Sequence, residues 1–397
     1  MIEILRKEDC CGCSACVSIC NQSAIEFKQD EEGFLYPVIN KDNCVNCGLC
    51  DKVCPLKRRL SDPQTSSIVT VKEYYALRHK NKDILDNSSS GGAFSLIAEY
   101  VLKKKGVVCG VEYSSDGVVH HAFAESLKDL EKFRGSKYAQ SDIRGTFRDI
   151  KKFLKADRYV LFSGTPCQID GLKKYLMKDY TKLITVDLVC HSIPSPLIYK
   201  EYTEYASRIL GHRIVGIDMR YKRTYGWSHR YSYRFHLENG KSTIDPLWIV
   251  NWGKLFFSEL INRPSCGECQ YTNLNRPGDF TIADFWDDSH KRPDIYSKEG
   301  TSLFLVNTEK GQHIFDEFKN AADCWAITKE EALQPCLVHP TVQNPKRKDF
   351  WEYYHRKGFR KTYKKYFAEK KIRTIKKIIK IILTKCHIFY LCTWKQV

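Results

Sequence analysis

Eight of the eighteen cysteines occur in two copies of one spacing that is typical of iron–sulfur proteins. In each copy, three cysteines are separated by two residues each, and a fourth follows after three more residues. In this pattern the first three thiolates bind one [4Fe-4S] cluster, and the fourth binds the other. The sequence therefore predicts cluster one at Cys10, Cys13, Cys16 and Cys54, and cluster two at Cys44, Cys47, Cys50 and Cys20. Disulfides and zinc are the alternatives, which the tandem crossover spacing disfavours. Cys11 lies outside the pattern and is predicted to be a packed thiol.

Four further cysteines indicate a third cluster. Cys167 and Cys190 follow apolar runs that are typical of strands, and Cys266 and Cys269 form a chelating Cys-x2-Cys pair. In open α/β sheets, ligands bind beyond the carboxyl ends of the strands. We therefore predict a third cluster at these four thiols, with zinc at the Cys-x2-Cys pair or simple packing as the alternatives. Cys109 is expected at another such strand end.

Two stretches of small residues could lie against a phosphate. The run from Asn87 to Gly92 precedes a helix predicted to begin at Ala93, where free N–H groups and the helix dipole attract anions. A serine run before a helix is more often only an N-cap. The second stretch, a turn between a strand and a helix, consists of Gly164, Thr165, Pro166, Cys167 and Gln168.

Several charged or titratable side chains are candidates for chemistry near these turns. Arg134 and Lys137, in RGSKYAQSD, could face the phosphates or the reduced ring of a flavin; as exposed surface charges they would have no role. His120, His121 and His191 are candidate proton donors, with a structural role as the alternative for each. No Ser/His/Asp arrangement or carboxylate pair indicates hydrolysis.

The charge of the chain is concentrated in its last part. The 397 residues carry a formal net charge of +17, and residues 346–397 alone hold 17 Lys and Arg against 3 Asp and Glu. We expect no signal peptide, because cysteine ligands begin within ten residues of the start, and no apolar run is long enough to span a membrane. Thiolate-bound clusters and many unpaired cysteines favour a reducing cytoplasm.

The elements that must position these residues divide the chain into five parts. The expected parts are a dicluster module at 1–60, a linker at 61–72, two parts of a main body at 73–155 and 156–345, and a basic tail at 346–397. A hairpin is predicted between the two cysteine motifs, and another is predicted to turn at Asn239-Gly240. In the body, strand patterns alternate with helix patterns, which indicates an α/β fold with a mixed, partly parallel sheet.

The tail predicts a basic amphipathic helix. From Lys370, the isoleucines Ile372, Ile375, Ile379 and Ile382 recur at helical spacing among lysines and an arginine. Such a helix binds the anionic inner face of the cytoplasmic membrane, each basic residue contributing about 1 kcal/mol. Packing on the body is the main alternative. Nucleic-acid binding is not expected, because no recognition module accompanies the charge.

Five motifs together resemble one family. NSSSGGAF, GSKYAQSD, LFSGTPCQIDGL, VDLVCHSIPSP and CGECQYTNLNRPGDFTIADFW occur in the order found in beta subunits of coenzyme F-420 hydrogenases and dehydrogenases. The resemblance covers roughly residues 1–345. It implies an α/β flavoprotein, with FAD phosphates at Ser89, Ser90, Gly91 and Gly92, and with Lys137 and the turn from Gly164 to Gln168 near the flavin. A bacterial branch with this dicluster module is similar to products found beside polysaccharide biosynthesis enzymes.

We therefore expect a flavin- and iron–sulfur-dependent oxidoreductase. Its FAD would exchange a hydride or two electrons with a deazaflavin or another reduced substrate, and two or three [4Fe-4S] clusters would exchange single electrons with a donor or acceptor protein. Lys137 and His191 are the candidate catalytic residues. The alternatives are an electron-transfer subunit without its own substrate site, or an assembly or binding protein with an empty flavin site.

Overall fold

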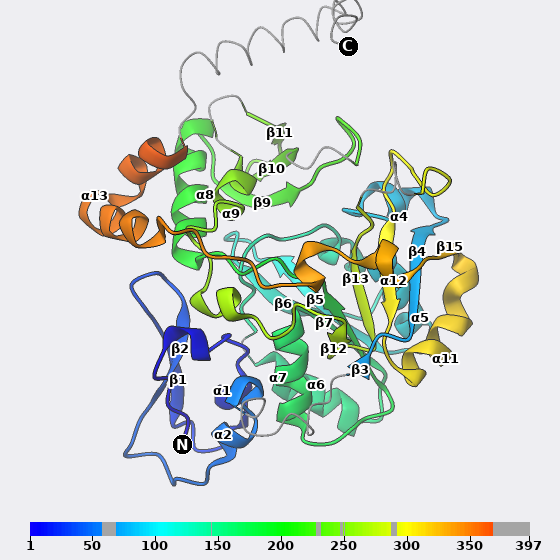
Figure 1. Cartoon of the computed structure of the whole chain (residues 1–397), viewed down its shortest axis with the longest axis horizontal. Helices are drawn as coiled ribbons and strands as arrows, with labels where there is room; N and C mark the ends of the chain where they lie inside the picture. The colour runs from blue at the N-terminus through cyan, green and yellow to red at the C-terminus, as the bar shows by residue number, and fades with distance from the viewer. Residues whose placement is uncertain are drawn as a thin grey trace, which may run out of the picture.

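The computed structural model describes residues 1–57, 69–143, 145–227, 232–246, 249, 251–286 and 292–367. In Figure 1 the N-terminal module, in dark blue, lies at one side of a larger domain that contains the main sheet. Its elements are η1 (Lys7–Asp9), α1 (Ala15–Ile19), β1 (Ile25–Gln29), β2 (Leu35–Ile39) and α2 (Leu49–Lys52). The ferredoxin-like module and the α/β sheet domain confirm the predicted fold class.

The predicted hairpin between the cysteine motifs is present. β1 and β2 pair antiparallel with Ile25 opposite Ile39, and the Asp30 carboxylate accepts hydrogen bonds from the backbone of Glu32 and Phe34 in the turn. Gly33 has φ +84°, and a Cβ there would lie 2.4 Å from Cβ of Leu197. The turn therefore needs glycine both for its backbone angle and for its contact with the main domain.

The main domain contains an eight-stranded mixed sheet. Across the sheet the strands are β15 (Ala322–Ala326), β4 (Glu73–His79), β14 (Ser302–Val306), β13 (Phe280–Asp284), β8 (Leu183–Leu188), β7 (Val160–Gly164), β5 (Val107–Tyr113) and β6 (Val119–Ala124). β13, β8, β7 and β5 are parallel neighbours, whereas β15, β14 and β6 pair antiparallel. Strands from both predicted parts of the body thus share one sheet.

Helices cover both faces of this sheet. On one face α5 (Ala93–Lys103) and α11 (Glu309–Phe318) pack on Val108, Leu161 and Ile184, and on the other α6 (Thr146–Lys155) and α7 (Pro166–Leu176) pack on the alternate residues of the same strands. This is the two-residue period of a strand that is buried on both sides. Shorter elements complete the domain: β3 (Val69–Thr70), α4 (Lys82–Asp86), η3 (Asp129–Phe133), η4 (Pro264–Glu268), β12 (Asn275–Arg276), η5 (Lys319–Ala321), α12 (Lys329–Ala332) and η6 (Pro335–Leu337).

Cys109 does not lie at a strand end, which corrects the expectation from sequence. β5 continues to Tyr113, so Cys109 lies inside the strand, opposite Phe162 of β7 and fully buried. From the sequence, Cys109 was expected to close the strand Gly-Val-Val-Cys-Gly-Val. Gly110 lies inside the strand, and glycine is needed there because a Cβ would lie 2.7 Å from the Phe133 ring.

A second, smaller sheet forms a separate layer above the first (Figure 1). It contains β9 (Ile214–Met219), β10 (Tyr233–Leu237) and β11 (Ser242–Ile244), with the predicted antiparallel hairpin turning at Gly240, where φ is +76°. Its hydrophobic core is shared with α8 (Pro196–Leu210), α9 (Trp252–Phe256) and α13 (Arg347–Phe367).

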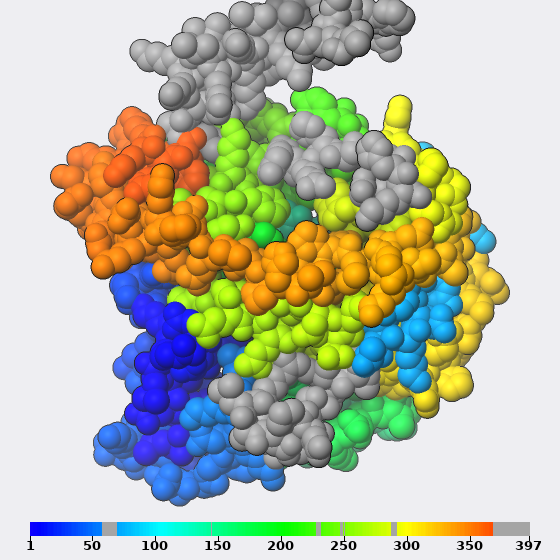
Figure 2. Space-filling model, in the orientation of Figure 1, coloured from blue at the N-terminus to red at the C-terminus, as the bar shows by residue number. Residues whose placement is uncertain are grey.

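Residues 335–346 form a strap that leads into α13. In Figure 2 this orange segment crosses the front of the molecule over yellow-green residues. Gly358, with φ +71°, breaks the helical geometry inside α13. The predicted amphipathic helix from Lys370 lies outside the described residues. Within the described part of the chain, no helix has the length and apolar character needed to cross a membrane.

Candidate electron-transfer site

The four thiols assigned to cluster one line a single hollow in the N-terminal module. Apolar side chains such as Ile2, Ile4 and Phe27 wall this hollow. The cysteines that line it are Cys10, Cys13, Cys16 and Cys54, together with Cys11. Cys54 comes from the second motif, so this lining supports the predicted crossover and fits a [4Fe-4S] cluster.

The thiols assigned to cluster two are more exposed. The Cys50 Sγ accepts a hydrogen bond from the backbone N–H of Ile2 at 3.2 Å, and the Cys20 Sγ accepts one from Ala24 at 3.4 Å. Such N–H donors to sulfur help set the potential of a cluster. Cys44 is half-buried and Cys47 is exposed. Cluster two would therefore lie nearer solvent than cluster one.

The module contacts the main domain through the ligands of cluster one. α1 packs on α7, and a Cβ added to Gly171 in α7 would lie 2.9 Å from the Cys13 Sγ. Glycine in a helix costs about 1 kcal/mol relative to alanine. Packing therefore explains why position 171 is a glycine, because only a residue without a side chain lets the Cys13 loop approach the helix.

The four thiols predicted for a third cluster gather around Cys190. Burial raises the pKa of Cys190 well above its ordinary value, and charge on four neighbouring thiols raises it further. These neighbours are Cys266, Cys167, Cys269 and Cys336. Burial also raises the pKa of Cys266 to about 12, although its Sγ accepts a hydrogen bond from the Ile193 N–H at 3.4 Å. A metal cluster would have to displace these protons, because the thiolate is the ligand form of cysteine.

The four thiols do not form a ready site for one metal ion. Among the described residues, no three His, Cys, Asp or Glu side chains stand close enough together to hold a single metal ion. A tetrahedral zinc site needs its sulfurs about 2.3 Å from one ion. A four-iron cluster spreads its ligands more widely than that.

Cys11 and Arg263 lie between cluster one and the third group. A hydrogen bond with the Cys11 thiol is the main cause that raises the pKa of Cys167. Arg263 donates from Nε to the Cys10 carbonyl at 2.8 Å, and its own carbonyl accepts the N–H of Cys266 at 3.0 Å. The two predicted cluster sites are therefore neighbours. Sequence reasoning missed Arg263, although its position three residues before Cys266 was a signal.

The strap brings a further thiol to His191. The Cys336 Sγ lies 3.6 Å from His191 Nδ1, and Glu259 Oε1 lies 2.7 Å from His191 Nε2. Burial opposes a charge on the imidazole, but the contacts with Cys336 and Glu259 outweigh it and raise the pKa of His191 to about 9. His191 thus holds its proton at neutral pH beside Cys190, which suits a proton donor.

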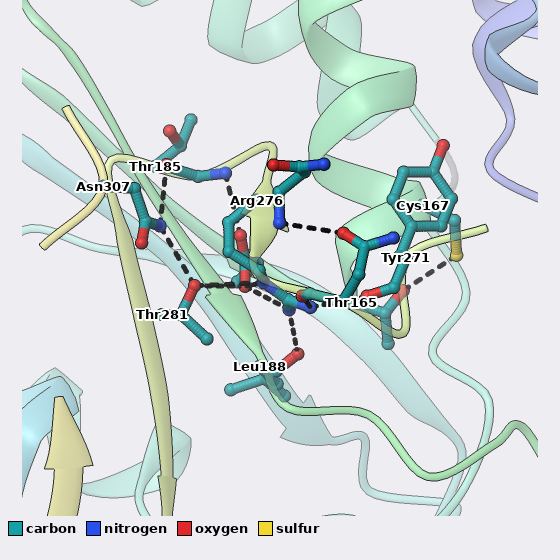
Figure 3. A network of polar contacts seen from close by, with 12 residues as sticks. Thr165, Cys167, Thr185, Leu188, Tyr271, Arg276, Thr281 and Asn307 are labelled. Atoms are coloured by element: carbon teal, nitrogen blue, oxygen red, sulfur yellow. Dashed lines mark hydrogen bonds and ion pairs between the residues drawn. The ribbon is translucent and has the colours of Figure 1, made fainter. Parts of the chain in front are cut away.

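A buried polar network stabilises the end of β8 that carries Cys190 (Figure 3). Arg276 donates to the Asp187 carboxylate from both Nε and Nη2, at 3.0 and 2.5 Å, and to the Leu188 carbonyl at 2.9 Å. The same carboxylate accepts from Thr281 and from the Gly278 N–H. Arg276 and Asp187 are 1% and 0% exposed, so this pair is fully removed from solvent.

The serine turn predicted to bind phosphate begins α5. Its N-cap, Gly92, has φ +84° and no side-chain cap, so no side chain occupies the N–H groups of the first turn. Those groups and the helix dipole would suit a phosphate. Gly91 was expected to lie against a phosphate, but the structure gives another reason for glycine at this position. A Cβ on Gly91 would lie 2.3 Å from the Leu77 carbonyl oxygen, so the sheet, and not a ligand, excludes a side chain there.

The RGSKYAQSD segment meets the serine turn. The Ser136 N–H donates to the Ser89 Oγ at 2.7 Å, which places Lys137 one residue from this contact. Lys137 donates to the carbonyls of Lys132 and Arg134, and burial lowers the pKa of its ammonium to about 7. The segment that carries Lys137 therefore meets the serine turn, while the Lys137 ammonium itself binds carbonyls of its own neighbourhood.

His121 connects the second turn, which begins at Gly164, with the RGSKYAQSD segment. His121 contacts Ser141 through Nδ1 and the Ser163 carbonyl through Nε2, just before Gly164. Burial lowers the pKa of His121 to about 4, so His121 is a neutral bridge between the two segments and not an acid.

Thr165 and Gln168 form a capping box at the start of α7, which gives Gln168 a structural role. The Thr165 Oγ1 lies 3.2 Å from the Cys167 Sγ.

Lys222 is a second buried lysine at the serine turn, and sequence reasoning missed it. Its Nζ donates to the Ser90 carbonyl at 2.9 Å and also contacts the Glu299 carbonyl. Burial lowers the pKa of Lys222 to about 8. Lys222 follows β9 in the chain, and no local motif in the sequence marks it.

Three regions of the chain match known protein families. Residues 9–57 match the 4Fe-4S dicluster domain. Residues 74–146 match the N-terminal part, and residues 157–331 the C-terminal part, of the coenzyme F420 hydrogenase/dehydrogenase beta subunit.

Individual relatives are more distant. The chain is 23% identical over 180 residues to a subunit of the F(420)H(2) dehydrogenase of Methanosarcina mazei, a match that covers 42% of this chain and about half, 48%, of that protein. A chain of the F420-reducing [NiFe] hydrogenase complex of Methanosarcina barkeri is 18% identical with a TM-score of 0.45, over 77% of this chain and 93% of that one.

Proposed function

Because the chain belongs to the family of coenzyme F420 hydrogenase/dehydrogenase beta subunits and carries a 4Fe-4S dicluster domain, we propose that it is an iron–sulfur flavoprotein oxidoreductase. The dicluster domain implies two [4Fe-4S] clusters, and we propose a third cluster and FAD in the main domain. The observation that carries this proposal is that Cys54 of the second motif lines one hollow with Cys10, Cys13 and Cys16 of the first.

Each part of the chain has a defined task in this proposal. When bound, the clusters supply one-electron steps and the flavin supplies two-electron chemistry with an organic substrate. The first turn of α5, from Gly92, binds the FAD phosphates together with Ser89 and Ser90. Lys137 faces the flavin, and the Gly164–Gln168 turn approaches it. His191 supplies a proton near the third cluster.

The partner in this proposal is another protein of the same assembly. The matching family model describes a beta subunit, and the Methanosarcina mazei relative is named as a dehydrogenase subunit, which favours a chain that exchanges electrons within a complex. An electron-transfer subunit without its own substrate site is the second candidate. Reduction of a dye by the isolated chain, with a reduced deazaflavin as donor, separates the two. The deazaflavin, the polysaccharide setting and the membrane-surface tail stay predictions from sequence alone.

Cys190→Ala is expected to remove the third cluster only. The thiols of Cys266, Cys167 and Cys269 gather around Cys190, so its loss leaves three ligands. Iron content after anaerobic reconstitution should fall from about twelve to about eight atoms per chain, with both N-terminal clusters retained. Cys336→Ala is the matched control, because Cys336 is a neighbouring thiol outside the assigned four. Equal iron in Cys190→Ala and wild type would contradict the third cluster.

Lys137→Met is expected to weaken FAD binding at least tenfold. A charge-assisted hydrogen bond contributes about 1.5–3 kcal/mol, and 1.4 kcal/mol corresponds to tenfold in Kd. The pKa of Lys137 is about 7 without ligand, so an anionic ligand must draw in a proton at higher pH, and FAD affinity should fall as the pH rises above 7. Lys132→Met, in η3 just before that segment and 38% exposed, should bind FAD normally. Titration of the apoprotein at 450 nm checks both variants, and equal affinities would move the flavin away from Lys137.

A further inference from the structure

Arg263 is a fully buried cation at the contact between the N-terminal module and the main domain. Its side chain is 0% exposed. From Nε it donates to the Cys10 carbonyl at 2.8 Å, and from Nη2 to the Leu35 carbonyl at 2.9 Å and to the Cys10 Sγ at 3.5 Å. The guanidinium therefore lies directly against a predicted ligand of cluster one.

No carboxylate balances this charge among the described residues. Three other largely buried arginines each contact a carboxylate, but Arg263 forms no ion pair, and its Nη1 has no hydrogen-bond partner. The three pairs are Arg220 with Asp284, Arg276 with Asp187, and Arg347 with Glu32. Burying an unpaired charge is costly, so a negative charge of another kind must compensate it.

The groups that face Arg263 are thiols from both cluster sites. Cys10 and Cys11 lie on the side of the module, and Cys266 lies three residues along η4, with its N–H on the Arg263 carbonyl. The rings of Tyr36 and Phe34 shield the guanidinium, with centroids 4.5 and 5.4 Å from its central carbon. The guanidinium therefore lies against the Cys10 loop, and the backbone carbonyl of Arg263 binds the loop that carries Cys266.

We propose that Arg263 is a shared charge-balancing residue for cluster one and the third cluster, and that it raises the reduction potential of the cluster at Cys10 and of the cluster at Cys266. The second half of this inference rests on the third cluster of the proposed function. Reduction adds one electron to a cluster, breaks no bond and needs no proton. A permanent cation nearby favours that extra negative charge by Coulomb attraction, which is strong where water is excluded.

A purely structural role is the alternative. Arg263 also joins the module to the main domain through the carbonyls of Cys10 and Leu35. If that were its whole contribution, the removal of its charge would change stability and leave the potentials unaltered. If Arg263 balances charge, removing its charge should change the reduction potentials. A change in the shape of the donor that keeps the charge should change them less.

The test compares Arg263→Gln, which removes the charge, with Arg263→Lys, which keeps it. Both full-length proteins are reconstituted with iron and sulfide, and their clusters are titrated potentiometrically with EPR detection. In Arg263→Gln the reduction equilibrium constant of cluster one should fall at least tenfold, which is about 59 mV toward more negative potential for a one-electron couple. In Arg263→Lys it should stay within threefold of wild type.

Either of two results would overturn the proposal: unchanged potentials in Arg263→Gln, or an equally large shift in Arg263→Lys. If Arg263→Gln did not retain cluster one, Arg263→Lys would decide alone, because a tenfold shift with the charge kept excludes charge balancing. The third cluster is tested separately by iron content in Cys266→Ala. Should that variant lose no iron, the proposed third cluster fails, while the effect of Arg263 on cluster one remains measurable.

Discussion

Cys54→Ala is expected to abolish cluster one and to spare cluster two, although Cys54 belongs to the second motif. In the folded module Cys54 lines the same hollow as Cys10, Cys13 and Cys16. A cluster left with three thiolates loses its iron readily, so the chain should lose about four iron atoms. The EPR spectrum of the clusters that remain should therefore match that of Cys13→Ala.

Two controls make this result specific. Cys44→Ala removes a ligand of the second motif alone, and its spectrum should differ from that of Cys54→Ala. Cys11→Ala alters a thiol that lines the hollow outside the assigned four, and it should keep its iron. A Cys54→Ala spectrum that matches Cys44→Ala would show that the motifs are not crossed.

Arg276→Met is expected to lower the free energy of unfolding by about 3–5 kcal/mol, the usual cost of removing one partner from a buried ion pair. The Asp187 carboxylate would stay buried with hydrogen bonds from Thr281 and the Gly278 N–H but without a cation. Arg276 also binds the Leu188 carbonyl, two residues before Cys190. The variant should therefore lose part of the third cluster as well as stability.

A partly exposed ion pair at the surface, whose arginine also lies 3.5 Å from Glu331, provides the comparison. Arg292 pairs with Asp294 at 2.8 Å, and their side chains are 24% and 56% exposed. Exposed pairs contribute about 0–1 kcal/mol, so Arg292→Met should change urea stability by no more than that. A loss below 1 kcal/mol in Arg276→Met would mean that the network in Figure 3 does not stabilise the sheet.

The two variants affect neighbouring parts of the molecule. Cys13 approaches α7 at Gly171, and α7 begins at the turn that carries Cys167. Cys190 follows β8, which Arg276 secures. Changes in the module and in the sheet should therefore both be visible in the iron–sulfur spectra, each on a different cluster.

Local patterns were enough for much of the fold. The spacing of the eight cysteines, the helices at Ala93–Lys103 and Pro166–Leu176, and the strands at Val160–Gly164 and Leu183–Leu188 follow from nearby residues. Hydrophobic periodicity and backbone hydrogen bonds act over a few residues, so a sequence displays them directly. Cys109 was misplaced because its environment depends on Phe133, which packs on Gly110 from another segment.

The sequence by itself determined which residue types could bind clusters and in which elements they lie. The crossover spacing already predicted that Cys54 joins Cys10, whereas only the tertiary structure decided that Cys11 meets Cys167 and that Cys336 meets His191. It alone also revealed the positions of Lys222 and Arg263, whose neighbours come from distant segments. The reason is physical, because packing of the module on α7 and of the strap on the sheet brings these segments together, and no local interaction encodes that approach.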